Sequence, residues 1–243
     1  MSDAPASVIY RRIPACDQAL VREAAAYGVA DLHESMSVVA GRMALLSPAM
    51  KALNPGVRIA GQAVTAQNYP GDALAVHKAI QLAQAGQVVV CTGGGGTDGA
   101  MLGELLATYA AAKGIAGIVI EGSIRDTDRL REMRFPVWAT SISAAHDEKR
   151  GPAAVNVPIV CAGTAIQPGD VIAADGDGVL AIPRHLLAGA VAGARARASQ
   201  EDTIRERLRA GDALFDIMGI QSMVEAAGLE ERDCTWQDDE ERR

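Results

Sequence analysis

Short apolar runs that alternate with predicted helices are the feature that most limits how this chain can fold. Val88–Cys91 and Ile118–Ile120 have the length and composition of strands buried on both faces of a parallel sheet. Val137–Thr140 follows as a third strand, after a short charged helix predicted at Thr127–Met133. This β-α-β-α-β order predicts parallel strands joined by right-handed crossovers.

The sequence on either side of this unit has other patterns. Upstream, Val57–Ala66 alternates as a strand and Ala73–Ala85 is a predicted helix. Downstream, strands are predicted without helices between them, at Val155–Cys161, Val171–Ala174 and Val179–Ile182. The last two strands flank Asp175-Gly176-Asp177-Gly178, which is a hairpin-turn sequence.

Two helices are predicted near the C-terminus, over Leu186–Ala210 and Asp212–Ala227. The longer one becomes highly charged toward its end, a pattern typical of a helix that reaches a neighbouring subunit. The predicted fold class is α/β, a layered β/β/α domain of swivelling type with a partly parallel sheet. We expect one domain over residues 1–243, with a C-terminal helical extension at about 186–230.

Composition excludes several classes of function. The formal net charge of −7 argues against a nucleic-acid partner, because phosphate binding needs clustered basic residues. No apolar run approaches the roughly 20 residues of a membrane span, and Met1–Pro14 does not have the pattern of a signal peptide. The four cysteines lack zinc-ligand spacing. We therefore expect a cytoplasmic protein without a membrane or nucleic-acid partner.

The glycine-rich loop Gly93–Gly99 has three possible interpretations. Gly94, Gly96 and Gly99 match a dinucleotide-binding fingerprint, because the loop follows a predicted strand and opens a predicted helix, with Glu121 at the end of the next strand. The loop could instead be a flexible connection without a ligand. The third interpretation is an anion cradle formed by backbone N–H groups at a helix N-terminus.

Three charged residues follow the ends of neighbouring predicted strands. Glu104 is expected one turn into a helix whose apolar face is Leu102, Leu105, Leu106 and Tyr109, and Arg125-Asp126 follows the next strand. Both positions therefore fall at the same edge of the sheet. Two carboxylates with water suit a hard divalent ion such as Mg²⁺ or Mn²⁺, and the planar fork of an arginine suits an anionic substrate.

The residues around this constellation resemble the RraA-like family, and within it the class II pyruvate aldolases. Those enzymes act on 4-hydroxy-4-methyl-2-oxoglutarate and 4-carboxy-4-hydroxy-2-oxoadipate. The resemblance extends from Val8 to about Gly211. It is carried by Val8–Arg11, His33–Met36, Thr97-Asp98-Gly99, Gly103–Ala107, Arg125-Asp126, Phe135–Trp138, Val155–Gly163 and Pro168–Asp175.

The resemblance implies a role for each matching residue. Asp126 would bind the metal directly, Glu104 would do so through a water molecule, and Glu201 through water from an adjacent subunit. Arg125 would bind the keto-acid and stabilise its enolate. The substrate carboxylate would be held by the backbone at Gly103, Leu105 and Leu106. The resemblance further implies a cytoplasmic lyase of aromatic-compound catabolism that assembles as trimers or hexamers.

Two segments depart from the family pattern. The family's Gly-Asp-Leu-Leu-Ala run has Glu104 in place of the aspartate, which adds one methylene between backbone and carboxylate. Ala144–Pro152 does not match the family sequence, so substrate preference stays open.

The expected reaction is retro-aldol cleavage of a 4-hydroxy-2-oxo di- or tricarboxylic acid to pyruvate and a second keto-acid. Oxaloacetate decarboxylation is an expected side activity, since it passes through the same enolate. A lysine Schiff base is disfavoured, because Lys51, Lys78, Lys113 and Lys149 do not project from predicted strand ends.

Other functions stay open. The chain could be a non-enzymatic RraA-like regulator that binds ribonuclease E, a lyase for another keto-acid or sugar-acid, or a dehydrogenase. His33 could be structural or catalytic.

Overall fold

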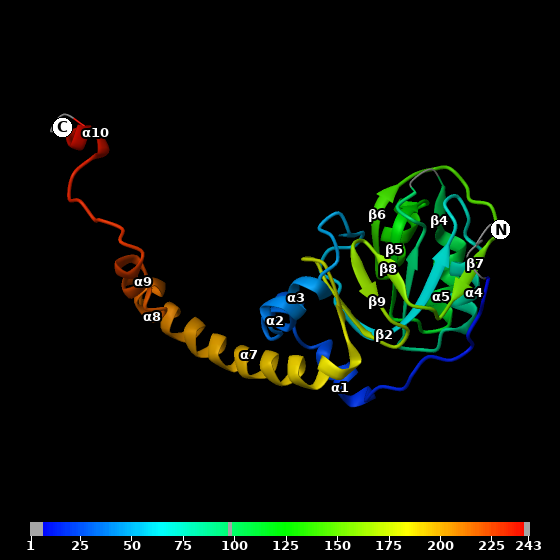
Figure 1. The fold of residues 1–243 in the computed structure, drawn as a ribbon, viewed down its shortest axis with the longest axis horizontal. Coiled ribbons are helices and arrows are strands. Elements are labelled where there is room, and N and C mark those ends of the chain that lie inside the picture. The colour runs from blue at the N-terminus through cyan, green and yellow to red at the C-terminus, as the bar shows by residue number, and fades with distance from the viewer. Residues whose placement is uncertain (1–6, 97–98, 241–243) are drawn as a thin grey trace, which may run out of the picture. The chain divides into compact units, whose positions relative to one another are not determined.

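A curled sheet forms the centre of the first of two compact units, Met1–Arg197. The computed structural model describes residues 7–96 and 99–240, and within them this sheet has nine strands (Figure 1). Seven strands follow the order β1-β6-β5-β3-β2-β10-β11, while β4 pairs with β5 and β7 pairs with β2. Their bounds are β1 Lys51–Ala52, β2 Ile59–Asn68, β3 Val88–Thr92, β4 Ala100–Leu102, β5 Gly117–Ile124, β6 Val137–Ile142, β7 Ala153–Val155, β10 Val171–Ala174 and β11 Val179–Ile182.

Helices and a separate hairpin complete the chain. The hairpin consists of β8 (Ile159–Cys161) and β9 (Thr164–Ile166). The α-helices of the first unit are α1 Gln18–Ala24, α2 Val29–Glu34, α3 Val38–Ala44, α4 Leu74–Leu82, α5 Glu104–Ala112 and α6 Thr127–Met133. The long helix α7 (Leu187–Arg209) follows a short 3₁₀ turn and leads to α8 Leu214–Ile217, α9 Ile220–Ala226 and α10 Trp236–Glu240.

The predicted parallel unit is confirmed. β2 pairs with β3, β3 with β5, and β5 with β6, all in parallel. The expected strands Val171–Ala174 and Val179–Ile182 are β10 and β11, which pair antiparallel across the Asp175–Gly178 turn. The α/β fold class with a partly parallel sheet is therefore correct.

Alternate side chains of the central strands enter two different cores. In β3, Val89 and Cys91 pack into the cluster that includes α4 and α5, whereas Val88 and Val90 pack on the opposite face with the β8–β9 hairpin. The strand is therefore buried on both faces, which explains why its sequence is apolar throughout rather than alternating.

The sheet curls around the β8–β9 hairpin. β6 and β10–β11 lie toward opposite ends of the strand order, yet the indole Nε1 of Trp138 in β6 donates a buried hydrogen bond of 2.8 Å to the carbonyl of Asp175. Trp138 also shares the inner cluster with Ile172 and Val179. The outer face of β10–β11 packs against α1, α2 and α7. The result is a half-barrel with a filled interior.

Three local predictions are wrong; in the first two, tertiary contacts override a short apolar pattern, and in the third a glycine interrupts the helix. Leu102 belongs to β4 rather than to a helix, and Leu105 is 81% exposed, so the predicted apolar face of that helix does not exist. Val155–Cys161 is divided between β7 and β8. The predicted second C-terminal helix is broken into α8 and α9 at Gly219, whose φ is +62°.

The second unit, Ala198–Arg243, has no buried residue among its described side chains. Large apolar side chains that are exposed in it are Leu208, Leu214, Phe215, Met218, Met223, Leu229 and Trp236. It therefore lacks a hydrophobic core of its own.

Among the residues that the structure describes, no helix has both the length and the apolar character needed to cross a membrane.

Close packing at Gly61 of β2 gives a test of the fold. A Cβ at Gly61 would lie 2.4 Å from the Gly86 carbonyl oxygen and 2.9 Å from the Val88 side chain. We expect Gly61→Ala to lower the free energy of unfolding by about 2–3 kcal/mol, measured by urea denaturation. The control is Gly176→Ala, where a Cβ would meet nothing within 4 Å, with an expected change within about 0.5 kcal/mol. Equal stability of the two variants would contradict this packing.

Candidate active site

The candidate site lies where β4 and β5 end. β4 is followed by Gly103 and the start of α5, while β5 is followed by Arg125 and Asp126. The Arg125 N–H donates to the Leu102 carbonyl at 2.9 Å, which holds the two chain segments side by side. They border a cavity of about 790 Å³, lined by Glu104, Leu105, Arg125, Asp126, Thr127, Asp128, Arg129, Ile142, Ser143 and Ala144.

Asp126 adopts an unusual backbone conformation. It precedes α6 with φ +56° and ψ +35°, in the left-handed region, and its side chain does not cap α6. Instead its Oδ2 accepts a hydrogen bond of 3.0 Å from the Glu104 N–H, at the first turn of α5. An aspartate before a helix ordinarily caps that helix. The left-handed backbone therefore turns this carboxylate toward the neighbouring element, and such strained positions concentrate at functional sites.

Gly103 is required by close approach rather than by its own backbone angles. A Cβ at Gly103 would lie 2.6 Å from Asp126 Oδ2 and 3.2 Å from Arg125 Nε. Arg125 Nε is itself 3.8 Å from Asp126 Oδ2, so the guanidinium and the carboxylate share the space above this glycine. Any side chain at position 103 would displace one of them.

Glu104 is the first residue of α5, not one turn into the helix as the sequence predicted. The correction arises because β4 occupies the residues just before it. The Glu104 Oε1 accepts a hydrogen bond of 3.0 Å from the Thr108 hydroxyl, and the side chain lines the same cavity as Asp126. The predicted juxtaposition of Glu104, Arg125 and Asp126 at one sheet edge is thus present.

The donor set fits a hard divalent cation. Three carboxylates line the open cavity, and Asp128 is paired with Arg131, which leaves those of Glu104 and Asp126 as candidate ligands. Among the described residues, no group of three or more His, Cys, Asp or Glu side chains is placed to hold a metal ion. Mg²⁺ is commonly held by one or two protein carboxylates with water and substrate oxygens in the other positions. The site therefore has the number and type of protein ligands that such an ion uses.

Glu201 lies in the second unit, on the C-terminal part of α7, where Arg205 pairs with it at 2.5 Å. The structure describes a single chain, so a contribution of Glu201 to the site of an adjacent subunit stays a prediction.

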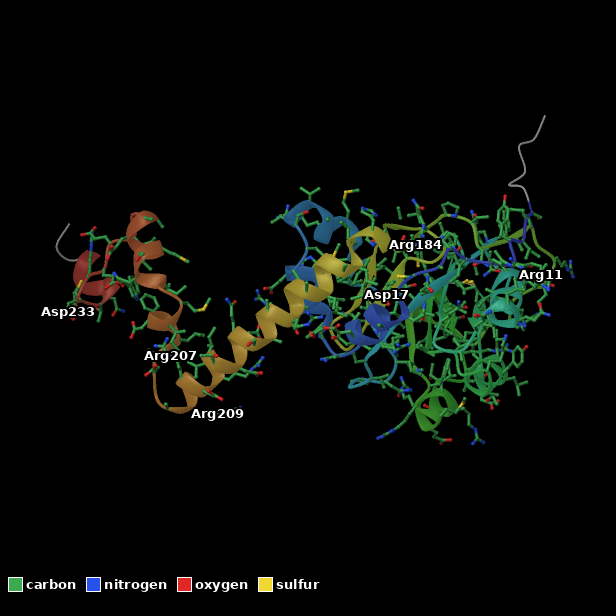
Figure 2. All side chains as sticks on the ribbon, turned by 90° about the horizontal axis from the view of Figure 1, so that it is seen from below. Arg11, Asp17, Arg184, Arg207, Arg209 and Asp233 are labelled. Atoms are coloured by element: carbon green, nitrogen blue, oxygen red, sulfur yellow. The ribbon has the colours of Figure 1, made fainter. Side chains whose placement is uncertain are left out.

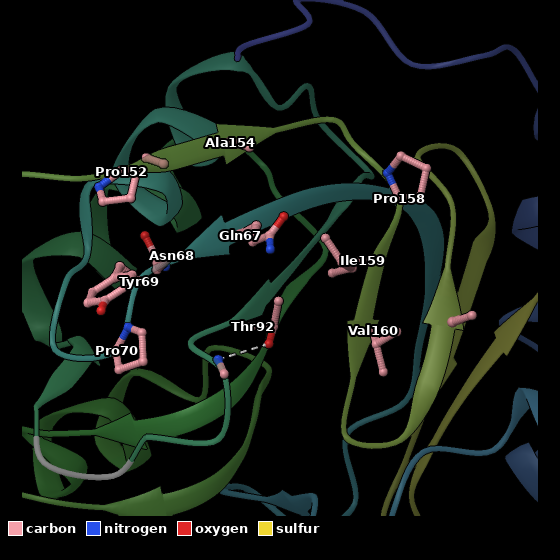
Figure 3. Close-up of a pocket in the computed structure, with 13 residues that line it drawn as sticks. Gln67, Asn68, Tyr69, Pro70, Thr92, Pro152, Ala154, Pro158, Ile159 and Val160 are labelled. Atoms are coloured by element: carbon pink, nitrogen blue, oxygen red, sulfur yellow. Dashed lines mark hydrogen bonds between the residues drawn. The ribbon is translucent and has the colours of Figure 1, made fainter. Parts of the chain in front are cut away.

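The glycine-rich loop does not have the structure of a dinucleotide fingerprint. It leads into strand β4, so it opens no helix whose N-terminus could hold a pyrophosphate. The carboxylate of Glu121 accepts a hydrogen bond of 2.5 Å from the Thr92 hydroxyl, which in turn accepts one from the Gly94 N–H (Figure 3). Thr97 and Asp98, part of the motif on which the resemblance rests, lie outside the described residues.

A second cavity, of about 600 Å³, lies between the end of β2 and the β8–β9 hairpin (Figure 3). Gln67, Tyr69 and Pro70 lie on one side and Ile159 and Val160 on the other. None of the described residues that line it is charged. It is therefore less suited than the Arg125 cavity to an anionic substrate.

Asp72 and Asp147 are two buried carboxyl groups that the sequence analysis missed. Asp147 belongs to the segment that departs from the family pattern, and neither of its oxygens has a hydrogen-bond partner among the described residues. Burial raises the pKa of Asp147, and the charge of Asp72 raises it further. Burial would raise the pKa of Asp72 too, but N–H groups of Leu74, Arg150 and Gly151 bind its carboxylate and lower that pKa overall.

The Pro70-Gly71-Asp72 turn is visible in the sequence, whereas no pattern marks Asp147 as buried. His33 belongs to α2, and its ring would lie 3.2 Å from a Cβ on Gly41 of α3; it does not line the candidate site.

Comparison with known proteins places residues 29–181 in the RraA-like family, described as Aldolase/RraA. The chain is 35% identical over 181 residues to a Halalkalibacterium halodurans protein named "Putative 4-hydroxy-4-methyl-2-oxoglutarate aldolase", covering 74% of this chain and 83% of that one. A Burkholderia mallei protein of the same name is 38% identical over 157 residues, covering 65% and 94%.

Solved structures share the fold of this chain. An uncharacterized protein from Pseudomonas syringae pv. tomato matches with a TM-score of 0.74 and 29% identity, over 84% of this chain and 98% of that one. Streptomyces coelicolor RraAS2, described as an unusual member of the RNase ES inhibitor RraA protein family, matches with a TM-score of 0.71 and 30% identity, over 80% and 98%.

The two buried carboxyl groups have opposite effects on stability as the pH changes. Because the folded-state pKa of Asp147 is raised, stability is lost as the pH rises from about 4, the ordinary aspartate pKa, through the folded value. The folded-state pKa of Asp72 is lowered. Its contribution to stability is therefore present above the ordinary aspartate pKa and is lost as the pH falls through the folded-state pKa.

At pH 7.5 we therefore expect Asp147→Asn to raise the melting temperature, with a smaller gain at pH 4. Asp72→Asn should lower stability by about 2–3 kcal/mol, because three N–H groups lose a charged acceptor. Thermal unfolding of both variants across this pH range checks the prediction. A melting temperature lowered by Asp147→Asn at pH 7.5 would show that the carboxyl has a stabilising partner.

Proposed function

This chain belongs to the RraA-like family, and we propose that it is a divalent-metal-dependent lyase that cleaves a 4-hydroxy-2-oxo di- or tricarboxylic acid. The products would be pyruvate and a second keto-acid. The proposal is supported by relatives named as aldolases of 4-hydroxy-4-methyl-2-oxoglutarate. Its structural support is the cavity at the ends of β4 and β5, which Glu104, Arg125 and Asp126 line together.

Asp126 and Glu104 would hold the metal ion, Asp126 directly and Glu104 through water. When bound, a divalent cation acts as a Lewis acid on the 2-keto group and so favours formation of the enolate. Oxygen ligands and an open cavity are consistent with Mg²⁺ or Mn²⁺. Glu201 of an adjacent subunit is proposed to complete the site through a further water molecule.

Arg125 would bind the substrate through its guanidinium. The side chain is half-exposed in the cavity, and its Nε is kept beside Asp126. A planar fork of N–H donors can hold the keto oxygen and stabilise the negative charge that develops there during cleavage. Arg125 is therefore assigned both to binding and to stabilising the enolate.

The start of α5 would bind the substrate's carboxylate. N–H groups in the first turn of a helix have no acceptor within the helix, and the positive end of the helix dipole attracts anions. The Glu104 N–H is taken by Asp126, so the anion would be bound by the backbone of Gly103, Leu105 and Leu106. The 81% exposure of the Leu105 side chain is consistent with an entrance at this turn.

Glu104 is proposed to direct proton transfer. Its Oε1 is fixed by Thr108, and its carboxylate would accept the proton of the substrate's 4-hydroxyl group through a water molecule. The C3–C4 bond then breaks, its electron pair forms the enolate of pyruvate, and the second keto-acid is released. Protonation at C3 gives pyruvate. Oxaloacetate would lose CO₂ through the same enolate, which makes its decarboxylation an expected side activity.

A second candidate is a non-enzymatic regulator that binds a ribonuclease of the E type. The similarity to RraAS2, described as belonging to an RNase inhibitor family, is the observation that supports it. The arrangement of Gly103, Arg125 and Asp126 supports the enzyme instead, because a binding surface does not require a carboxylate held against a glycine in a strained conformation.

Pyruvate release tests the proposed reaction. We expect Mg²⁺-dependent pyruvate formation from 4-hydroxy-4-methyl-2-oxoglutarate and from oxaloacetate, and its loss with EDTA. Asp126→Asn should lower kcat/KM by about 100-fold or more, since it removes the direct ligand of the metal. Asp128→Asn is the matched control, because Asp128 lines the same cavity and pairs with Arg131 on the surface of α6. The absence of pyruvate from both substrates would reject the aldolase.

The length of the side chain at position 104 provides a second test of the proposed reaction. Asp replaces this glutamate in the family pattern, so we expect Glu104→Asp to keep kcat/KM within about tenfold. Glu104→Gln has the same size but cannot accept a proton, and it should lower kcat by about 100-fold or more. Measuring kcat and KM for both variants separates carboxylate chemistry from side-chain length. Equal activity of Glu104→Gln and the parent chain would remove Glu104 from the mechanism.

A further inference from the structure

A third cavity lies near the amino ends of the parallel strands, opposite to the candidate active site at their carboxyl ends. Glu104 and Asp126 follow the carboxyl ends of β4 and β5, whereas this cavity is bordered by Gln87, which directly precedes β3, and by Leu82 at the end of α4. Its volume is about 410 Å³. It is lined by Arg11, Arg12, Ile13, Pro14, Ala15, Cys16, Gln18, Gln62, Val64, Leu82, Gln84, Gln87 and Asn156.

The cavity is basic although the chain as a whole is acidic. Arg11 and Arg12 are exposed at its border, and neither guanidinium has a hydrogen bond or ion pair among the described residues. The extended segment that carries them runs from Arg11 toward Asp17 (Figure 2). No described residue that lines the cavity is acidic, and burial raises the pKa of the Cys16 thiol, which is therefore neutral at pH 7. The Asp17 carboxylate is engaged in capping α1.

Asn156 lines this cavity, and its side-chain oxygen is a buried acceptor without a partner among the described residues. The residue is only 6% exposed, and its Nδ2 donates a hydrogen bond of 2.7 Å to the Tyr10 carbonyl. Its backbone N–H is bound to the Thr65 carbonyl, so both the main chain and the side chain are fixed. The Oδ1 has no hydrogen-bond partner among the described residues. A buried acceptor without a partner is destabilising, and a ligand that donates a hydrogen bond to it would offset that cost.

The wall beside Asn156 is rigid. The Nε2 of Gln62 donates to the carbonyls of Pro14 and Gly169, and its Oε1 accepts a hydrogen bond of 2.7 Å from Gln18. Gln62 therefore ties the extended segment to β2 and to the turn before β10. The cavity exists with these contacts already made, so binding does not require them to form.

We propose that this cavity binds a small, non-aromatic organic anion that carries a hydroxyl group. The anionic group would pair with the guanidinium groups of Arg11 and Arg12, and the hydroxyl would donate to Asn156 Oδ1. The described lining has no aromatic ring on which a nucleobase could stack, which disfavours a nucleotide. Hydroxycarboxylates and phosphorylated polyols share the required chemistry. This second site is independent of the proposed lyase reaction.

Isothermal titration calorimetry on the full chain, freed of metal, tests the proposal. Citrate and glycerol 3-phosphate represent the two sources of the anion, and tricarballylate is citrate without its hydroxyl. AMP is the aromatic comparison. Arg11→Gln and Arg12→Gln remove the basic groups, while Arg209→Gln, an exposed residue of α7, removes one charge far along the sequence (Figure 2). Arg125→Ala removes the anion-binding group of the candidate active site.

We expect citrate or glycerol 3-phosphate to bind, and Arg11→Gln and Arg12→Gln each to weaken that binding about tenfold or more. Arg209→Gln and Arg125→Ala should leave it unchanged. Citrate should bind about tenfold more tightly than tricarballylate, as expected for one hydrogen bond to a buried acceptor.

Several results would overturn the proposal. No binding of citrate or glycerol 3-phosphate at about 10 mM would reject the site itself. If Arg125→Ala abolished binding, the anion would belong to the candidate active site. Unchanged binding in the Arg11→Gln and Arg12→Gln variants would likewise reject this cavity as the site. Equal affinity for citrate and tricarballylate would reject the contact with Asn156, and tighter binding of AMP would reject the non-aromatic class. Each result is separate from pyruvate release, so failure here leaves the lyase proposal intact.

Discussion

Burial of the central parallel strands on both faces is the constraint on which the rest of this structure depends. β3 and β5 have no face left for water, so one side must be covered by α4, α5 and α6 and the other by the β8–β9 hairpin. Covering the inner side requires the sheet to curl, and the buried hydrogen bond from Trp138 to Asp175 joins its two arms. The two candidate ligand cavities that contain arginine lie at opposite ends of the parallel strands, one near their carboxyl ends and the other near their amino ends.

The sequence predicted the elements whose pattern is local. β10, β11 and α6 have the expected bounds, because a strong turn or a clear period defines each of them. β4 was missed because its three residues resemble the first turn of the apolar helix that follows, and only pairing with β5 makes them a strand. Glu104 shifted to the helix start for the same reason. The burial of Asp147 depends on contacts between distant loops, which no local pattern contains.

The candidate site combines a predictable set of residues with a geometry that was not predictable. Charged residues after neighbouring parallel strands must meet at one sheet edge, and Glu104, Arg125 and Asp126 do so. The left-handed backbone of Asp126 and its contact above Gly103 follow from packing between α5 and α6. That contact explains why the Gly-Glu-Leu-Leu-Ala run begins with glycine. Only a residue without a side chain leaves room for both the Asp126 carboxylate and the Arg125 guanidinium.

The positions of the two tryptophans give this protein a built-in pair of optical reporters. Trp138 is fully buried in the inner core, whereas Trp236 is 70% exposed in the second unit, which has no core. Their emission therefore comes from two different environments, one apolar and one aqueous. An aqueous quencher such as iodide reaches only the second, so the fluorescence that survives quenching belongs to the half-barrel. Unfolding of the half-barrel and ordering of the C-terminal helices can thus be followed separately in one unlabelled sample.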